Sequence, residues 1–274
     1  MLPADDIEIK LLLDAIYLRY HYDFRNYSMA SLRRRLELAR LQLRSPSLSA
    51  LQERILRDPT VFTRLLQYLT VQVSDMFRDP AYFRVLRTEI VPTLLTYPSL
   101  RVWIAGCSSG EELYSFAILF AEEGLLDRTT FYATDINPEA LRKAEAGIFP
   151  LDRIQAFSEN HVASGGKGPL EKWFTSAYGS AVFDRSLRKN VVFSDHSLAT
   201  DNVFAEVQVV SCRNVLIYFD RTLQERAIGV MKDALCRRGF LGLGAKESLG
   251  HSKHGREFLD FAAAERWYQR VALR

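Results

Sequence analysis

The spacing of hydrophobic residues changes near residue 97, and this change constrains the fold more than any other feature of the chain. Before it, apolar residues recur at helical spacing and no convincing alternating strand pattern is found. After it, short apolar runs alternate with amphipathic stretches, which is typical of a mostly parallel, doubly wound sheet. We therefore predict an α/β protein with an all-helical N-terminal domain over residues 1–97 and a doubly wound domain over residues 98–274.

The composition is that of an ordinary globular protein. Of 274 residues, 48% are hydrophobic and 25% are charged, which argues against disordered, collagen-like and coiled-coil classes. No apolar run approaches the ~20 residues of a membrane-spanning helix, and the first residues lack the pattern of a secretion signal. We expect a cytoplasmic protein without direct membrane insertion. Cys107, Cys212 and Cys236 are too far apart for a metal-binding pair, and we expect no metal site.

Residues 19–44 form a basic segment, with seven arginines against only two acidic residues. The spacing of Leu32, Leu36, Ala39 and Leu43 predicts an amphipathic helix. A neighbouring face of this helix carries three arginines: Arg33, Arg40 and Arg44. This face is either a solvated edge or a docking surface for an acidic partner. Nucleic acid is a weaker candidate, because the net charge is only +3 and the segment lacks interleaved aromatic residues.

A loop with two glycines follows the first predicted strand. Gly106 and Gly110 allow a sharp turn, and a helix with free N–H groups begins directly after them. Asp135 follows the second predicted strand, 25 residues after Gly110, a separation found between glycine loops and ribose-binding acids. The loop has no P-loop lysine, and Glu111 and Glu112 would repel a pyrophosphate. These acids favour an adenosine ligand with a cationic end, which describes S-adenosylmethionine.

The same loop also matches the G-x-S-x-G pattern of a serine hydrolase. Ser108 would be the nucleophile, with His251 or His254 as the base. The motif follows the first strand of the sheet rather than a late central one, and the spacing to Asp135 would be accidental. We therefore rank the hydrolase below the cofactor-binding interpretation.

A third polar cluster follows the fourth predicted strand. Arg213, Asn214 and Tyr218 lie there among apolar neighbours. Buried polar groups require hydrogen-bond partners. We expect a cofactor and a substrate to supply those partners.

These segments resemble the CheR family of S-adenosylmethionine-dependent methyltransferases, which methylate glutamate side chains of bacterial chemoreceptors. The matching segments are Val71–Pro80, Arg101–Ser115, Ala133–Ile136, Cys212–Asp220 and, more loosely, Leu243–Leu249. They span most of the chain in the order typical of the family. The resemblance implies a Rossmann-like methyltransferase sheet with a small β-subdomain inserted at about residues 160–190.

The resemblance also implies the site and its ligands. The cofactor is S-adenosylmethionine, the product S-adenosylhomocysteine, and the cofactor-binding residues are Gln72, Ser74, Arg78, Gly106, Glu111, Glu112, Asp135, Ser197, Leu198, Arg213 and Asn214. Arg101 and Tyr218 would be catalytic and face the reacting carboxylate. The helix with Arg33, Arg40 and Arg44 would dock on the cytoplasmic helical bundle of a methyl-accepting chemoreceptor.

The sequence departs from the family at a few positions. Gln72 and Ser74 stand where asparagine and threonine are usual, which still permits hydrogen bonds. Leu113 replaces a usual proline, and Ala245 and Lys246 replace a usual histidine and serine, so we expect no polar role at the last two positions.

The activity implied is that of a protein-glutamate O-methyltransferase in chemosensory adaptation. A glutamate carboxylate with an ordinary pKa of ~4.3 is already ionised at neutral pH, so the reaction needs no general base. The alternative is a module that binds S-adenosylmethionine or S-adenosylhomocysteine and regulates a partner without turnover. We expect a monomer.

Overall fold

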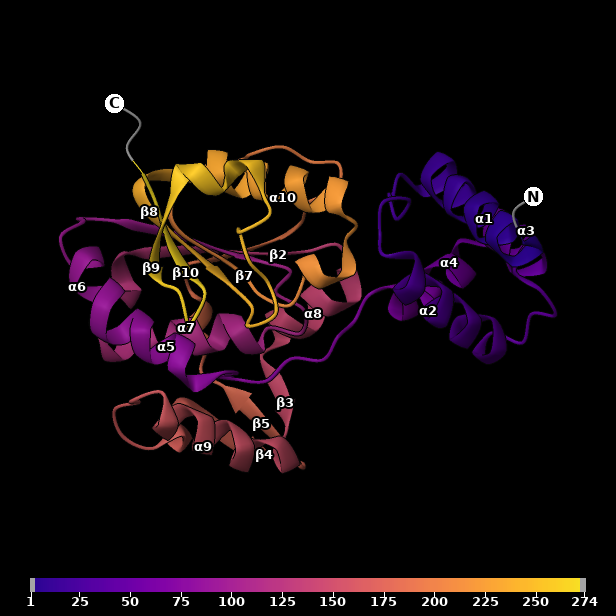
Figure 1. Cartoon of the computed structure of the whole chain (residues 1–274). Helices are drawn as coiled ribbons and strands as arrows, with labels where there is room; N and C mark the ends of the chain where they lie inside the picture. Colours follow the sequence, from indigo (N-terminus) through magenta and orange to yellow (C-terminus); the bar gives the residue numbers. More distant parts are fainter. Residues whose placement is uncertain (1–2, 272–274) are drawn as a thin grey trace.

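The computed structural model describes residues 3–271, which divide into two parts (Figure 1). Four helices form the N-terminal part, and the following chain forms an α/β part around a seven-stranded sheet. An irregular segment over residues 70–79 connects them. No described helix is long and apolar enough to cross a membrane.

The helices of the N-terminal part are α1 (Ala4–Tyr20), α2 (Met29–Gln42), α3 (Leu48–Arg57) and α4 (Pro59–Leu69). The side chains of Ser47 and Asp58 cap α3 and α4, because each accepts a hydrogen bond from a backbone N–H in the first helical turn. Leu12, Leu36 and Leu65 lie in the core that these helices share. The predicted helical N-terminal domain is confirmed.

The large sheet has the strand order β6-β2-β1-β7-β8-β10-β9. Its strands are β1 (Leu100–Ala105), β2 (Thr129–Asp135), β6 (Val191–Asp195), β7 (Val207–Cys212), β8 (Leu235–Leu243), β9 (Phe258–Ala262) and β10 (Trp267–Arg270). The first five strands in this order are parallel, whereas β10 and β9 are antiparallel to their neighbours. The predicted doubly wound sheet is confirmed, with β9 as an additional edge strand.

Helices cover both faces of this sheet. α7 (Glu111–Glu122) lies on one face and α10 (Arg221–Ala234) on the other (Figure 1). α8 (Pro138–Ala146) contacts β2 and β6. Because β6, β2, β1 and β7 are parallel neighbours, their carboxyl ends lie together at one edge of the sheet.

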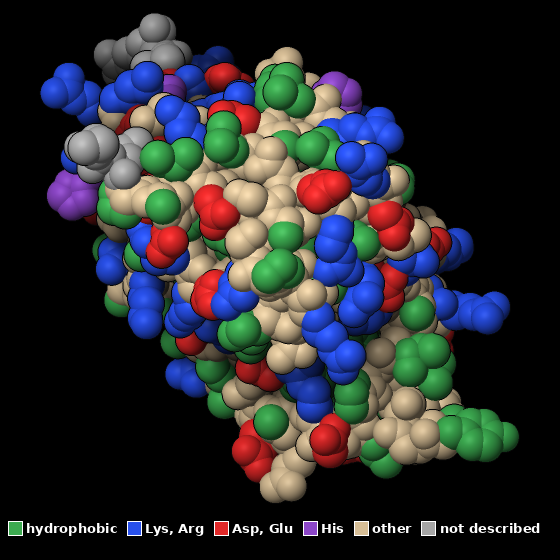
Figure 2. Space-filling model, turned by 90° about the vertical axis from the view of Figure 1, so that its right-hand side faces the viewer, with side chains coloured by type: hydrophobic (Ala, Val, Ile, Leu, Met, Phe, Trp, Pro, Cys, Tyr) green, Lys and Arg blue, Asp and Glu red, His purple; other side chains and the backbone are tan. Residues whose placement is uncertain are grey.

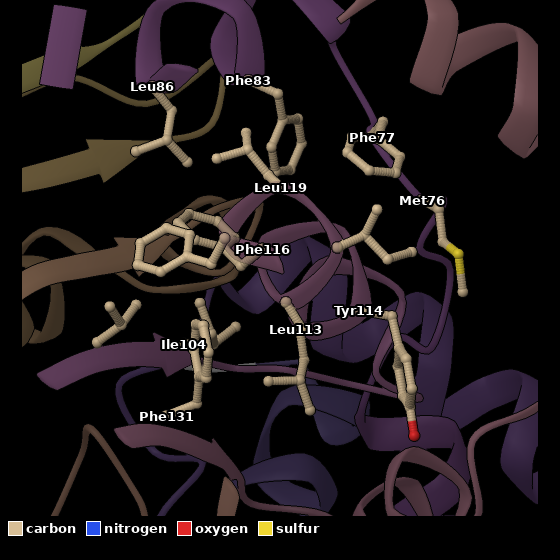
Figure 3. Packing of buried hydrophobic residues seen from close by; sticks show 14 of the residues in the cluster. Met76, Phe77, Phe83, Leu86, Ile104, Leu113, Tyr114, Phe116, Leu119 and Phe131 are labelled. Atoms are coloured by element: carbon tan, nitrogen blue, oxygen red, sulfur yellow. The ribbon is translucent and has the colours of Figure 1, made fainter. Parts of the chain in front are cut away.

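The chain between residues 80 and 94 is helical, but it packs in the core of the α/β part. It consists of α5 (Pro80–Val85), a π-helical turn (Leu86–Ile90) and α6 (Val91–Leu94). Phe83 and Leu86 lie in one core with Ile104 of β1 and Phe116 of α7 (Figure 3). The boundary between the two cores therefore lies at residues 70–79, and the boundary that we predicted near residue 97 is corrected.

A small antiparallel sheet is inserted between β2 and β6. It has the order β3-β5-β4, formed by β3 (Ile148–Pro150), β4 (Phe174–Ala177) and β5 (Ser180–Phe183), and α9 (Ile154–Ala163) precedes β4. Phe149 and Phe183 pack edge-on against Tyr114 of α7. The insertion was expected at about residues 160–190, but its first strand already begins at Ile148.

Candidate active site

A cavity lies at the carboxyl ends of β1, β2, β6 and β7, where their loops meet the N-terminal part. Open α/β sheets bind ligands at this edge. Ten of the eleven residues expected to bind the cofactor line it, as does Tyr218; the ten are Gln72, Ser74, Arg78, Gly106, Glu112, Asp135, Ser197, Leu198, Arg213 and Asn214. The structure therefore brings together residues that are up to 146 positions apart in sequence, from Gln72 to Tyr218.

The loop after β1 is held close to the cavity by its glycines. Gly106 has a φ of +72°, and a Cβ there would lie 2.5 Å from a methyl carbon of Val215. Gly110 has a φ of +98°, and its Cβ would lie 2.9 Å from the backbone of Ala144. Larger residues would push the loop away from both neighbours. The sequence-based expectation of a sharp turn with close backbone approach agrees with this geometry.

Asp135 presents its carboxylate at the end of β2. Its Oδ2 accepts a hydrogen bond from Ser108 N at 2.8 Å, and its Oδ1 accepts one from Asn137 N at 2.9 Å. Burial raises the pKa of the Asp135 carboxyl, while these N–H groups oppose the shift. Each carboxylate oxygen has more than one lone pair. Both oxygens can therefore also accept hydrogen bonds from the two hydroxyls of a ribose.

Glu112 lies in the cavity on the other side of the glycine loop. Its Oε1 accepts a hydrogen bond from the Ser211 hydroxyl at 2.6 Å, and its Oε2 lies 3.1 Å from Nη1 of Arg213. Arg213 also donates from Nη2 to the carbonyl of Arg78 and to the carboxylate of Asp79, both at 2.7 Å. The buried guanidinium of Arg213 thus connects β7 to the segment that joins the two parts of the chain.

The N-terminal part contributes a buried arginine that the sequence analysis missed. Arg35 of α2 is only 6% exposed and lines the cavity. Its Nη1 donates to the carbonyl of Leu69 at 2.5 Å, and its guanidinium lies 4.3 Å from the ring centre of Tyr218. No described carboxylate forms an ion pair with it, its Nε and Nη2 have no hydrogen-bond partner among the described residues, and burial lowers its pKa. A buried cation with free donors indicates an anionic ligand.

Other cavity residues also carry buried polar atoms without a partner among the described residues. They are Gln72 Nε2, Ser108 Oγ, His196 Nδ1 and Arg213 Nε. Native proteins rarely leave such atoms unsatisfied. Together with the carboxylates of Asp135 and Glu112, these unpartnered atoms fit an adenosine ligand that has a cationic amine and an anionic carboxylate.

Comparison with known proteins agrees with this fit. Residues 72–264 match the family described as CheR methyltransferase, SAM binding domain, and residues 7–70 match the family described as CheR methyltransferase, all-alpha domain. The chain belongs to the CheR methyltransferase family. S-adenosylmethionine is accordingly its cofactor, and the two family matches meet within the irregular segment between α4 and α5.

Relatives of this CheR methyltransferase occur in several bacteria. A Pseudomonas putida protein named as a methyltransferase, Cher3, is 55% identical over 97% of this chain and 97% of its own length. A chemotaxis protein methyltransferase of Listeria innocua is 30% identical over 70% of this chain and 71% of that protein. A chemotaxis protein methyltransferase of Salmonella typhimurium is 32% identical over 67% of this chain and 62% of that protein.

Glu111 does not line the cofactor cavity of this methyltransferase. It is 1% exposed, and its carboxylate lies 2.8 Å from both the guanidinium of Arg153 and the hydroxyl of Ser109. Successive side chains of a helix point about 100° apart, so Glu112 reaches the cavity and Glu111 cannot. Arg153 also contacts Asp75. Glu111 therefore joins the glycine loop to the inserted subdomain, which corrects its predicted role in cofactor binding.

Arg101 also lies outside the cavity. It is the second residue of β1, is exposed, and its backbone N–H donates to the Gln208 side chain at 2.7 Å. Ala105, at the other end of β1, is four residues further along the strand, a distance of roughly 13 Å. Because ligands bind beyond the carboxyl end, Arg101 cannot face a reacting carboxylate there. The predicted catalytic role of Arg101 is corrected.

The hydrolase alternative finds no support in the geometry. Ser108 is buried in a left-handed conformation with a φ of +51°, and its hydroxyl has no hydrogen-bond partner among the described residues. His251 and His254 do not line the cavity. A nucleophilic serine requires a base within hydrogen-bond distance.

The three arginines predicted to dock a receptor differ in their contacts. Arg33 pairs with Asp6, whereas Arg40 lies 2.6 Å from the carboxylate of Glu37 and donates to backbone carbonyls that follow α2. Arg44 is exposed just beyond α2. Figure 2 looks onto the N-terminal side of the molecule and shows basic side chains there beside apolar ones. Leu38 and Leu41 of α2 are 50% and 57% exposed.

Proposed function

We propose that this methyltransferase transfers a methyl group from S-adenosylmethionine to glutamate side chains of a bacterial chemoreceptor. The observation that carries the proposal is the buried guanidinium of Arg35 beside Tyr218, which forms no ion pair within the described part of the chain. It is positioned by the N-terminal part, against the cofactor cavity of the α/β part. A carboxylate that enters this cavity would pair with the positive charge of Arg35 and accept its free hydrogen bonds.

The chain has distinct groups for each end of the cofactor. We assign the ribose hydroxyls to Asp135, the cationic amine to the side of the cavity with Glu112, and the adenine to the residues after β6. The last assignment follows from the strand order, since β6 and β1 lie on opposite sides of β2. Ser197 and Leu198 line the cavity on the β6 side. The bound cofactor supplies an electrophilic methyl group on a sulfonium.

The acceptor carboxylate needs positioning rather than a base. At neutral pH a glutamate with an ordinary pKa of ~4.3 is already a nucleophile. We infer that Nε and Nη2 of Arg35 orient one carboxylate oxygen and that the Tyr218 hydroxyl contacts the same group. Arg78 also lines the cavity and makes one long contact, 3.4 Å to the carbonyl of Val73. Most of the rate enhancement then comes from orientation and exclusion of water.

The receptor would approach along α2. This helix carries Arg35 on its inner face, and Arg34, Leu38 and Leu41 on its outer face. A receptor helix with acidic residues and an apolar stripe would complement that outer face, with Arg33, Arg40 and Arg44 at its margins. This arrangement would place the acceptor glutamate near Arg35. The pathway would be adaptation in chemosensory signalling, in the cytoplasm.

The test is transfer of a labelled methyl group to a purified cytoplasmic receptor fragment. Glutamyl methyl esters hydrolyse in mild alkali and release methanol, whereas methylated amines do not. We expect base-labile label on the fragment and no label when its glutamates are changed to alanine. Alkali-stable label would contradict glutamate as the acceptor. Binding of S-adenosylhomocysteine without transfer to any receptor fragment would favour the regulatory module instead.

A further inference from the structure

Glu247 is a buried carboxylate that the proposed reaction does not use. It lies in the segment Leu243–Leu249, which follows β8, and it does not line the cofactor cavity. Its side chain contacts the loop after β7. Oε2 accepts hydrogen bonds from Asn214 N at 2.9 Å and from Gly244 N at 2.7 Å, and Oε1 accepts one from Ile217 N at 3.3 Å. Glu247 is only 4% exposed.

The loop that receives these contacts carries four residues that line the cavity: Asn214, Val215, Tyr218 and Phe219. Asn214 has a φ of +60°, a left-handed conformation that is strained unless its surroundings hold it. The side-chain amide of Gln224 in α10 donates to the carbonyls of Leu216 and Phe219 at 3.0 Å and 3.2 Å. Glu247 thus satisfies backbone donors of this loop, and Gln224 satisfies backbone acceptors.

We propose that Glu247 is a positioning residue, whose carboxylate holds the Asn214–Phe219 loop so that Tyr218 faces the acceptor group. The inference rests on the proposed role of Tyr218. Three N–H donors converge on two oxygens, and a carboxylate offers an acceptor to all three. A glutamine has only one oxygen, so its NH₂ group would face at least one N–H donor. Hydrogen bonds to a charged acceptor are also stronger than neutral ones.

The packing around Gly244 provides a second way to disturb the same contact. A Cβ at this position would lie 2.8 Å from Asn214 N and 2.8 Å from Oε2 of Glu247. Gly244→Ala therefore pushes Asn214 N and Oε2 of Glu247 apart, although the chain still carries the Glu247 carboxylate. It serves as the second variant if Glu247→Gln does not fold.

The experiment is a double-mutant cycle on the methyl-transfer rate. We would measure kcat and KM for a receptor fragment at saturating S-adenosylmethionine with Glu247→Gln, Tyr218→Phe and the double variant. We expect Glu247→Gln to lower kcat by about tenfold with KM for the fragment within about twofold, as for a lost orientation. The double variant should be no slower than the slower single variant, because both changes remove one function.

Glu225→Gln is the matched control. Glu225 accepts hydrogen bonds from Ser252 Oγ at 3.1 Å and Lys253 N at 3.2 Å. It thus holds a later turn of the same segment, and among the described residues its carboxylate makes no hydrogen bond to the Asn214–Phe219 loop. Its kcat should stay within about twofold of the unsubstituted protein. Equal losses in Glu225→Gln and Glu247→Gln would show a general effect on folding and overturn the inference.

Four further outcomes separate the inference from the proposed function. An unchanged kcat in Glu247→Gln overturns the inference, as do losses that add in the double variant. A loss in Glu247→Gln with an unchanged kcat in Tyr218→Phe also overturns it, because Glu247 then acts through another group. Failure of the unsubstituted protein to methylate the fragment contradicts the proposed function itself.

Discussion

The two ends of the cavity are built in different ways. At the cofactor end, the chain itself fixes the polar groups: both oxygens of Asp135 accept backbone hydrogen bonds, and Glu112 is held by Ser211 and Arg213. At the acceptor end, Nε and Nη2 of the buried Arg35 have no hydrogen-bond partner among the described residues, and its guanidinium lies over the ring of Tyr218. The chain itself therefore holds the two carboxylates of the cofactor end in place, whereas the guanidinium of Arg35 needs a ligand to satisfy its remaining donors. This difference predicts that cofactor affinity and methyl transfer can be separated by mutation.

The largest effect is expected at the cofactor end. Asp135→Ala should weaken S-adenosylhomocysteine binding by about 100-fold, or ~2.7 kcal/mol, because it removes the acceptor of the ribose hydroxyls. Isothermal titration calorimetry measures this directly. The control is Asp195→Ala at the end of the neighbouring β6, which does not line the cavity and should keep its affinity. Equal weakening in both variants would contradict a specific ribose site.

At the acceptor end, Tyr218→Phe should lower turnover and leave cofactor affinity intact. We expect a roughly tenfold loss in kcat, since one hydrogen-bond donor to the acceptor group is lost. The dissociation constant of S-adenosylhomocysteine should change by less than about twofold. Steady-state kinetics and calorimetry on the same preparation give both values. An unchanged rate would remove Tyr218 from the mechanism.

The adjacent acids of α7 sharpen the comparison, because one faces the cavity and the other does not. Glu112→Gln should weaken S-adenosylhomocysteine binding by about tenfold, as a charge that faces the amine is lost. Glu111→Gln should leave that affinity unchanged and lower Tm by about 5 °C, because it removes the partner of Arg153. Calorimetry and thermal unfolding of both variants test this. The reverse pattern would show that Glu111 is the cofactor ligand.

The smallest effect is expected on the outer surface. Arg44→Glu should raise KM for the receptor fragment by about threefold at low salt and less at high salt, since exposed charges are screened. Arg57→Glu on α3 is the control, since Arg57 is also exposed but lies outside the basic segment. Steady-state kinetics at two ionic strengths would measure both. Equal changes in the two variants would show general repulsion rather than docking on α2.

The cofactor end was predictable because it is local in sequence. A strand, two glycines and an acid at the end of the next strand define Gly106, Gly110 and Asp135 with no knowledge of distant contacts. The direction of each side chain was harder to predict. Glu111 and Glu112 differ only by one helical step, and the partner that removes Glu111 from the cavity, Arg153, lies 42 residues away.

The acceptor end was harder to predict from the sequence, because it is formed by contacts between distant segments. Arg101 matched a family segment, but it lies at the amino end of β1, at the edge of the sheet opposite the cavity. Arg35 did leave a signal, because it occupies the same buried helical face as Leu32, Leu36 and Ala39. An arginine on an apolar face needs a partner. The sequence could therefore single out Arg35 as unusual, but only the structure shows that it reaches Tyr218.

Arg35→Ala is the measurement that tests the separation of the two ends most directly. The account predicts that S-adenosylhomocysteine affinity stays within about twofold, while kcat/KM for base-labile methyl transfer falls by roughly 100-fold, as for a lost charged hydrogen bond to the acceptor. Arg57→Ala on α3, an exposed arginine outside the basic segment, is the control and should retain at least half of the kcat/KM. Parallel losses of affinity and transfer in Arg35→Ala, or an unchanged kcat/KM, would contradict the account.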